Sequence, residues 1–247
     1  MPQVDILAPD FLKFLKLLTV GTYSKNDIPD YNSVYLATEQ GEYGDEPGQQ
    51  TLLCGYSLSF DQCMTSYMPC DGDLQNSVIS IPLESAKTLI SVFTKRAKQF
   101  SEDENYSLTL SYDGENEMLS VGERFGGGMP GDPIFALQIP GCVDGLGVVT
   151  AAKDMLSGQG ARTEVTTGDG VQIAPGNSVV LAPSTLQFLS AVGRNTKCGV
   201  TLYTVAHPWS THLFQSGVPG YQPFCRGAIV PTIADEDKGD EPDMELI

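Results

Sequence analysis

One pattern occurs twice in this chain, and the repetition limits the possible folds more than any other feature of the sequence. The run SVISIPLESAKTLISVF extends from Ser77 to Phe93, and SVVLAPSTLQFLSAV extends from Ser178 to Val192. Each run starts with β-branched residues, continues through a proline and ends with the spacing of an amphipathic helix. A chain of 247 residues is long enough for two modest domains. We therefore interpret the repeat as a sign of a duplicated domain.

The alignment of the two copies rests on their prolines. With Pro82 placed on Pro183, a slip of one residue brings Leu89 onto Leu189. The order around the first copy is strand, helix, strands, helix and strands, and the second copy follows it in a shorter form. Separate helices between antiparallel hairpins predict an α+β fold.

Hydrophobic spacing locates four helices. The clearest runs from Leu83 to Phe100, because Ala86, Leu89 and Phe93 share one face. The others are expected over 11–21 after an N-cap at Asp10, over 146–156 and over 184–194.

Runs rich in β-branched and aromatic residues between turn residues predict the strands. Four lie between Ser33 and Pro82, and residues 106–123 are typical of a hairpin with Asp113-Gly114 in its turn. Further strands are expected in IFALQIP, ARTEVTTGDGVQIAP, NSVVLAP, GVTLYTV, THLFQS and GAIVP. The glycines and prolines of RFGGGMPGDP cannot join a regular element, so they mark a linker. The predicted organisation is a first domain over 1–124, a connector over 125–133, a shortened second domain over 134–234 and a disordered acidic tail over 235–247.

The charge of the chain is strongly negative overall but unevenly distributed. The formal net charge is −17, and residues 235–247 hold seven acids against one lysine. Ten of the fourteen basic residues lie in or directly after the expected helices, where acids are nearly absent. Lysine-covered, solvated helix faces are the simplest explanation, since lysine forms helices well. Glutamate forms helices equally well, however, so a merely solvated face should carry acids too.

A positive helix surface on a negative protein favours a groove or channel that attracts a polyanion. Contact with phosphates, independent of base sequence, fits this surface best. The candidate DNA-binding residues are Lys13, Lys16, Lys87, Lys95, Arg96, Lys98, Lys153, Arg194 and Lys197.

The duplication, the basic helices and the acidic body together resemble the DNA sliding clamps, the processivity factors of replicative DNA polymerases. Residues 166–189 look like the bacterial beta clamp pattern Ala-Thr-Asp-Gly-His-Arg-Leu-Ala, followed by a strand, a proline and a helix. Gly168 stands where that threonine would be, and Val171-Gln172 replaces His-Arg. The closing GAIVPTIADED looks like the end of proliferating cell nuclear antigen, where a last strand meets Ala-Pro, Lys-Ile and an acidic tail.

The resemblance implies two similar DNA-clamp domains, with antiparallel sheets outside and basic helices lining an inner face. Six such domains form a ring in this family, so a two-domain chain would form a homotrimer, whereas the three-domain bacterial clamp forms a dimer. It also implies that the ring encircles duplex DNA, tethers a DNA polymerase as a processivity factor and is placed on DNA by a clamp loader.

Clamps bind a short hydrophobic peptide of their partners beside the interdomain connector and the C-terminal strand. Carried over to this sequence, the resemblance implies a pocket made by residues of the last strand, the connector and the first domain. These are Val230, Pro231, Phe125, Met129, Ala37 and Thr38. Plain core or loop packing is the alternative explanation for the last four.

Other classes of function lack a matching motif. The sequence has no Gly-x-Ser-x-Gly elbow and no P-loop, so we do not expect an enzyme. Neither His207 nor His212 has a cysteine at finger spacing, and we expect no metal and no cofactor. The six cysteines show no disulfide framework and are expected to be reduced and mostly buried. No apolar run has the length of a membrane span, which predicts a cytoplasmic protein, associated with the nucleoid or in the host cytoplasm if viral.

Two alternatives remain open at this point. One is a self-assembling structural or decoration protein of duplicated β-rich domains with no DNA role, which would not need acids excluded from its helices. The other is a clamp-like regulator that binds polymerases without encircling DNA.

Overall fold

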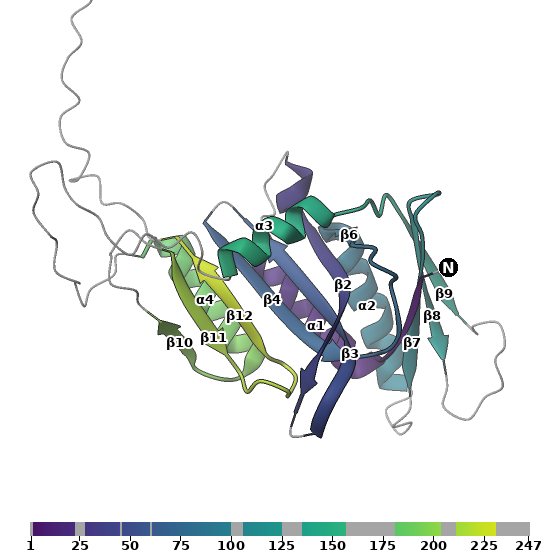
Figure 1. Cartoon of the computed structure of the whole chain (residues 1–247), viewed down its shortest axis with the longest axis horizontal. Helices are drawn as coiled ribbons and strands as arrows, with labels where there is room; N and C mark the ends of the chain where they lie inside the picture. Colours follow the sequence, from purple (N-terminus) through teal and green to yellow (C-terminus); the bar gives the residue numbers. More distant parts are fainter. Residues whose placement is uncertain are drawn as a thin grey trace, which may run out of the picture.

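The computed structural model describes residues 2–22, 28–44, 46–59, 61–99, 106–124, 135–156, 181–203 and 211–230. The α-helices within these ranges are α1 (Ala8–Leu18), α2 (Leu83–Gln99), α3 (Leu146–Leu156) and α4 (Pro183–Thr196), and the short 3-10 turns are η1 (Thr19–Gly21) and η2 (Pro29–Tyr31). The strands of the first half are β1 (Gln3–Leu7), β2 (Ser33–Tyr43), β3 (Glu46–Leu58), β4 (Gln62–Pro69), β5 (Asp71–Asp73), β6 (Ile79–Pro82), β7 (Ser107–Asp113) and β8 (Met118–Arg124). The remaining strands are β9 (Ala136–Pro140), β10 (Val200–Tyr203), β11 (His212–Ser216) and β12 (Cys225–Ile229) (Figure 1).

The strands form two antiparallel sheets, which confirms the α+β prediction. The smaller sheet has the order β5-β1-β7-β8-β9, and the larger has the order β10-β11-β12-β4-β3-β2-β6. Pairing of β12 with β4, in which Gly227 lies opposite Met64, joins the last three strands to the first half of the chain. Segments far apart in the sequence therefore share one continuous sheet.

The larger sheet is covered on both faces. Side chains alternate along a strand, so neighbouring residues of β2 point to opposite sides. Val34 and Leu36 belong to the hydrophobic core under α1 and α2. Tyr35 and Ala37 belong to a second core that includes Val149 of α3. Because both faces of the sheet are covered here, the first five residues of β2 are all buried, and buried residues do not alternate with exposed ones.

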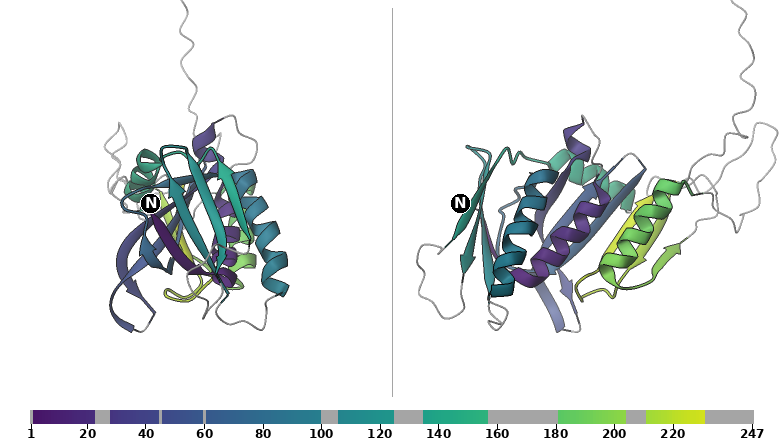
Figure 2. Two further views of the ribbon diagram at one scale, coloured as in Figure 1. Left: turned by 90° about the vertical axis from the view of Figure 1, so that its right-hand side faces the viewer. Right: turned by 180° about the vertical axis from the view of Figure 1, so that it is seen from behind.

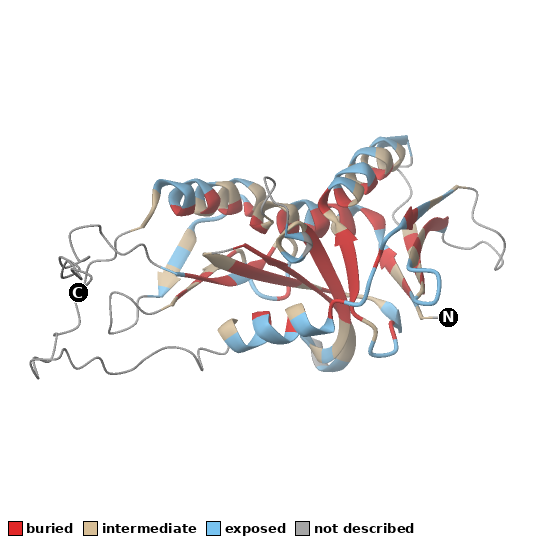
Figure 3. Cartoon of the chain, turned by 90° about the horizontal axis from the view of Figure 1, so that it is seen from above, coloured by how far each residue is buried: buried red, intermediate tan, exposed pale blue. Residues whose placement is uncertain are grey.

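Three helices form a layer on one side of the sheets, and α3 lies on the other side. α1 packs between α2 and α4, and Figure 2 shows the three helices side by side. Seen from above in Figure 3, the larger sheet separates this layer from α3. We call the outer surface of α1, α2 and α4 the helical face.

The repeat found in the sequence is a structural repeat. α2 begins directly after Pro82 and α4 begins at Pro183, and each is followed by a three-stranded antiparallel meander, β7-β8-β9 after α2 and β10-β11-β12 after α4. Three of the four buried residues of each helix correspond, each pair 99 residues apart: Ala86, Leu89 and Phe93 in α2 and Thr185, Phe188 and Val192 in α4. Leu89 thus corresponds to Phe188, so the predicted match with Leu189 is wrong by one residue.

Most helix predictions are confirmed within a residue or two. Helix α1 begins at Ala8, earlier than expected. Its proline is tolerated in the first turn, because the amide hydrogen that proline lacks would have no intrahelical partner there. Its N-cap is Leu7, without a side-chain cap, and Asp10 lies in the first turn instead. The predicted hairpin is β7 and β8, paired from Ser107 with Arg124 to Asp113 with Met118.

The strand expected to open the second domain pairs with the first half. β9 lies beside β8, with Leu137 opposite Val121, and extends the smaller sheet. The predicted connector, the acidic tail and the strands expected over 161–180 lie outside the described residues. The domain boundaries therefore stay a prediction.

Candidate nucleic-acid interface

Helix α1 exposes a narrow stripe because its neighbours cover most of its surface. Phe11, Phe14 and Leu15 are fully buried, whereas Lys13 and Lys16 are exposed one turn apart. This spacing puts both ammonium groups on the outer side of the central helix.

The flanking helices add five more exposed cations to the helical face. Lys87, Lys95 and Lys98 of α2 are exposed, on the side opposite buried Leu89 and Phe93. Arg194 lies in the last turn of α4, and Lys197 caps this helix; both are exposed. Seven of the nine predicted DNA-binding residues are thus brought onto one surface.

Two of these cations have carboxylate partners on the same helix. Lys13 lies 2.9 Å from Asp10, and Lys87 lies 2.7 Å from Glu84. Exposed pairs of this kind contribute little to stability. Lys16, Lys95, Lys98, Arg194 and Lys197 are exposed and form no ion pair with any described residue.

Arg96, also predicted to bind DNA, is held by the fold. Its guanidinium donates two hydrogen bonds to the carboxylate of Glu123 on β8, one of them at 2.6 Å. The Glu123 side chain has no exposed surface, and it also accepts a hydrogen bond of 2.9 Å from the hydroxyl of Tyr106. The guanidinium stacks over Phe135, 4.6 Å from the ring centroid. This geometry gives Arg96 a structural partner that helical spacing does not predict; the one local signal for it is that Glu123 is the single acid of β8.

Lys153 is separated from the other predicted cations by the sheet. It lies on α3, where its ammonium is 2.7 Å from Glu39 and 5.9 Å from the ring centroid of Tyr56. Burial opposes ionisation of Glu39, but hydrogen bonds from Lys153 and Tyr56 outweigh it and hold the pKa of Glu39 below its ordinary value. Lys153 therefore fastens α3 to the larger sheet and does not join the helical face.

The predicted peptide pocket is not assembled from the residues that the structure describes. Val230 is 38% exposed, and its amide donates to the carbonyl of Asp61. Ala37 lies on β2, three strands away, which is roughly 14 Å across the sheet alone. Thr38 donates a hydrogen bond of 2.6 Å to Asp73 and holds the loop after β5. Phe125, Met129 and Pro231 lie outside the described residues.

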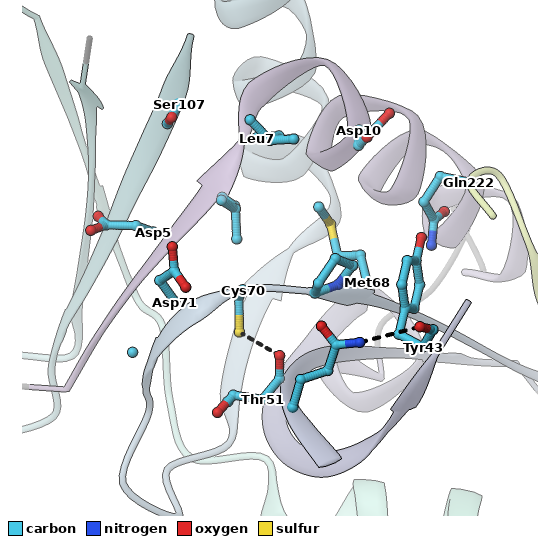
Figure 4. Close-up of a pocket in the computed structure, with 14 residues that line it drawn as sticks. Asp5, Leu7, Asp10, Tyr43, Thr51, Met68, Cys70, Asp71, Ser107 and Gln222 are labelled. Carbon is cyan, nitrogen blue, oxygen red and sulfur yellow. Dashed lines mark hydrogen bonds between the residues drawn. The ribbon is translucent and has the colours of Figure 1, made fainter. Parts of the chain in front are cut away.

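A cavity of about 460 Å³ opens between the two sheets beside the start of α1. Figure 4 shows Asp5, Asp71 and Cys70 on one side of it and Tyr43 and Gln222 on another. Asp5 is already bound by Thr109 and Arg124. Burial, together with Asp71 and Asp73, raises the pKa of the Cys70 thiol to about 12, which keeps the thiol protonated and a poor nucleophile.

Four of the five other cysteines are buried, as predicted, and Cys198 is exposed. Cys54, Cys63, Cys142 and Cys225 are buried free thiols, and burial raises the pKa of each to about 11 or 12. Among the described residues, no group of three or more histidine, cysteine or acidic side chains is placed to hold a metal ion. None of the described helices is long and apolar enough to cross a membrane.

Comparison with known proteins identifies the fold. No protein-family model matches the chain, and no curated protein sequence matches it. Solved structures do match. The beta sliding clamp of Caulobacter crescentus aligns over 94% of this chain and 66% of its own, with 13% identity and a TM-score of 0.54.

Two further clamps give the same result. The DNA polymerase III beta subunits of Thermotoga maritima and Pseudomonas aeruginosa each align over 95% of this chain and 66% of their own length, with 10% identity. Their TM-scores are 0.57 and 0.56. This chain thus spans just under two thirds of the clamp chains that it matches. With two antiparallel sheets, a layer of basic helices and this alignment over nearly its whole length, the chain has the fold of the DNA sliding clamps.

Proposed function

We propose that the chain is a sliding clamp, which encircles duplex DNA without sequence specificity and tethers a replicative DNA polymerase as its processivity factor. One observation carries the proposal: seven exposed cations lie on three neighbouring helices of a chain whose net charge is −17. A duplex near this face gains attraction to its phosphates and releases counterions. The acidic remainder of the protein repels DNA, so the helical face is the favoured surface for contact.

The role would be mechanical. Phosphate contacts position a protein on DNA without reading bases, which is what a protein that moves along a duplex needs. A cytoplasmic location at the nucleoid, or in the host cytoplasm for a viral protein, would follow from this role.

Encirclement requires several copies, and we propose three. Six clamp domains make a ring in the family that this chain resembles. The alignment over 66% of each bacterial clamp chain fits two domains out of three. A clamp loader would then open the ring to admit DNA.

Val230 is the described residue that we retain in the proposed partner pocket. It is a partly exposed apolar residue directly after β12, beside the turn that contains Asp61. An apolar anchor of a polymerase peptide would bury its exposed surface.

Retention on DNA of different topology tests the proposal. After loading, the protein should stay on closed circular DNA and slide off linear DNA of the same sequence. Blocking both ends of the linear DNA with a bound protein should restore retention. Equal retention on open linear and circular DNA would contradict encirclement, because simple binding depends on length and salt rather than on free ends.

A further inference from the structure

The helical face has two different ends. Helix α1 begins near the end of α2. The amide of Ala8 donates to the carbonyl of Tyr106, and the hydroxyl of Tyr106 and the guanidinium of Arg96, in the last turn of α2, both donate to Glu123. α4 ends at the same edge: Thr196 bonds Ser216 at 2.7 Å, and the loop after Ser216 brings Gln222 into the cavity beside Asp10. Figure 2 shows the three helices with these ends together.

Most of the positive charge of the helical face gathers at this end. Lys95 and Lys98 lie in the last two turns of α2, and Arg194 and Lys197 lie at the end of α4. We call these four residues the cationic edge. Asp10, in the first turn of α1, is the one carboxylate that the described parts of the three helices place near them, and it pairs with Lys13 in the middle of that helix.

The opposite end of the same face carries less positive charge. Lys87, in the first turns of α2, is paired with Glu84. The first turns of α4 expose Ser184, Leu186 and Gln187, which carry no charge. Lys16, in the last turn of α1, is the one cation at this end that forms no ion pair with a described residue.

Helix stability explains part of this placement, because cations near a helix C-terminus interact favourably with the helix dipole. It does not explain Lys197. This residue has φ 57°, a left-handed conformation that glycine or asparagine adopts at lower cost at the end of a helix. A lysine here retains a positive charge at the edge at the expense of local backbone free energy.

We propose that duplex DNA is held mainly by the cationic edge, so that phosphate contacts concentrate at one end of the helical face. This inference rests on the proposed function and adds that the clamp has a defined orientation relative to the DNA axis. A duplex on this face is bound tightly at one end and only loosely at the other, and the two directions along the DNA are not equivalent.

Two variants of equal charge test the inference. Lys98→Gln with Lys197→Gln removes two charges from the cationic edge. Lys16→Gln with Lys87→Gln removes two charges from the other end of the same face. Glu102, Asp103 and Glu104, which follow α2 outside the described residues, stay unchanged in both variants.

The measurement is the salt dependence of binding to a short labelled duplex by fluorescence anisotropy at low ionic strength. Each lost phosphate contact should lower the slope of log K against log salt by about 0.9, so the edge variant should lose about 1.8. The variant at the other end should lose clearly less, because the inference places fewer phosphate contacts there. Circular dichroism and thermal melting verify that both variants are folded.

The outcomes separate the two proposals. A clearly larger loss of slope in the edge variant than in the variant at the other end supports the inference. An equal loss in both variants, or no loss in the edge variant, overturns it while DNA binding by the clamp still stands. If the wild-type protein shows no salt-dependent binding at all, the proposed function itself fails, and the inference fails with it.

Discussion

The guanidinium of Arg96 lies against two groups of different chemistry, the buried carboxylate of Glu123 and the ring of Phe135. Arginine suits both contacts, because its planar fork matches a carboxylate and its face stacks on an aromatic ring. The pair connects the last turns of α2 to the smaller sheet. It therefore fixes the part of α2 that carries Lys95 and Lys98.

Replacing Arg96 should destabilise the protein far more than replacing its neighbour. Arg96→Met leaves the Glu123 carboxylate buried without its partner, a change that typically costs about 3–5 kcal/mol in the free energy of unfolding. Lys95→Met, on the exposed side of the same turn, should stay within about 0.5 kcal/mol of wild type. Urea denaturation measures both values.

Adding Glu123→Gln to Arg96→Met should recover part of the loss. The amide carries no charge to bury and still accepts the hydrogen bond from Tyr106. Equal stability of the Arg96→Met and Lys95→Met variants would show that the buried pair contributes nothing to the fold.

The sequence places Arg96 in the helix but does not reveal its partner. Helical spacing puts Lys95, Arg96 and Lys98 within about one turn, and two of the three are solvent-exposed as predicted. Nothing in that spacing indicates that Glu123, on another element, lies within reach. Long-range ion pairs depend on the packing of helix on sheet, which local patterns do not specify. The choice of arginine among lysines, and Glu123 as the single acid of β8, are the only local signals.

At the level of elements, the contact that joins the two halves of the chain is the pairing of β12 with β4. Gly227 lies at its centre, opposite Met64 on one side and Phe214 on the other. A Cβ atom at Gly227 would lie 2.3 Å from the Phe214 ring and 2.4 Å from the carbonyl oxygen of Cys63. The close approach of the strands here therefore requires glycine.

Gly227→Ala should loosen this junction. Overpacking of this kind typically costs about 1–3 kcal/mol, and here one of the clashing atoms is backbone and cannot rotate away. Hydrogen exchange should become faster in β11 and β12 than in β7 and β8. Gly147→Ala in α3 is the control, because nothing lies within 4 Å of its added Cβ and alanine favours a helix. Unchanged exchange in β12 of the Gly227→Ala variant would mean that the strands can move apart freely.

Elements were predicted more accurately than their places in the fold. The spacing of apolar residues located α2, α3 and α4 because buried faces recur with the helical period. It could not tell that α3 packs on the opposite side of the sheet from α1, since Val149 and Ala152 would be buried equally well on either side. For this reason the sequence predicts Lys153 on the same DNA-binding surface as the other helix cations, although it lies on the opposite side of the sheet.

At the scale of the whole molecule, each sheet ends in an edge strand that pairs with a described strand on one side only. β9 is such an edge strand in the smaller sheet, and β10 is one in the larger sheet. The amide of Glu123 donates to the carbonyl of Phe135, and hydrogen-bonded pairs alternate along an antiparallel ladder. Gln138 therefore directs its own amide away from β8, toward whatever lies beside the sheet. An open edge of this kind is a template for pairing with another chain.

If the ring closes through β9, a proline at position 138 should break it. Gln138→Pro removes the one outward amide at the middle of this strand and leaves pairing with β8 intact, which edge strands tolerate. Light scattering should then give the mass of a single chain, 26.5 kDa, where the wild-type protein gives three times this value. Gln138→Ala keeps the amide and should assemble like the wild type. A Gln138→Pro variant that still assembles would place the contact on another surface, and a wild-type mass of one chain at every concentration would leave no ring to hold the DNA.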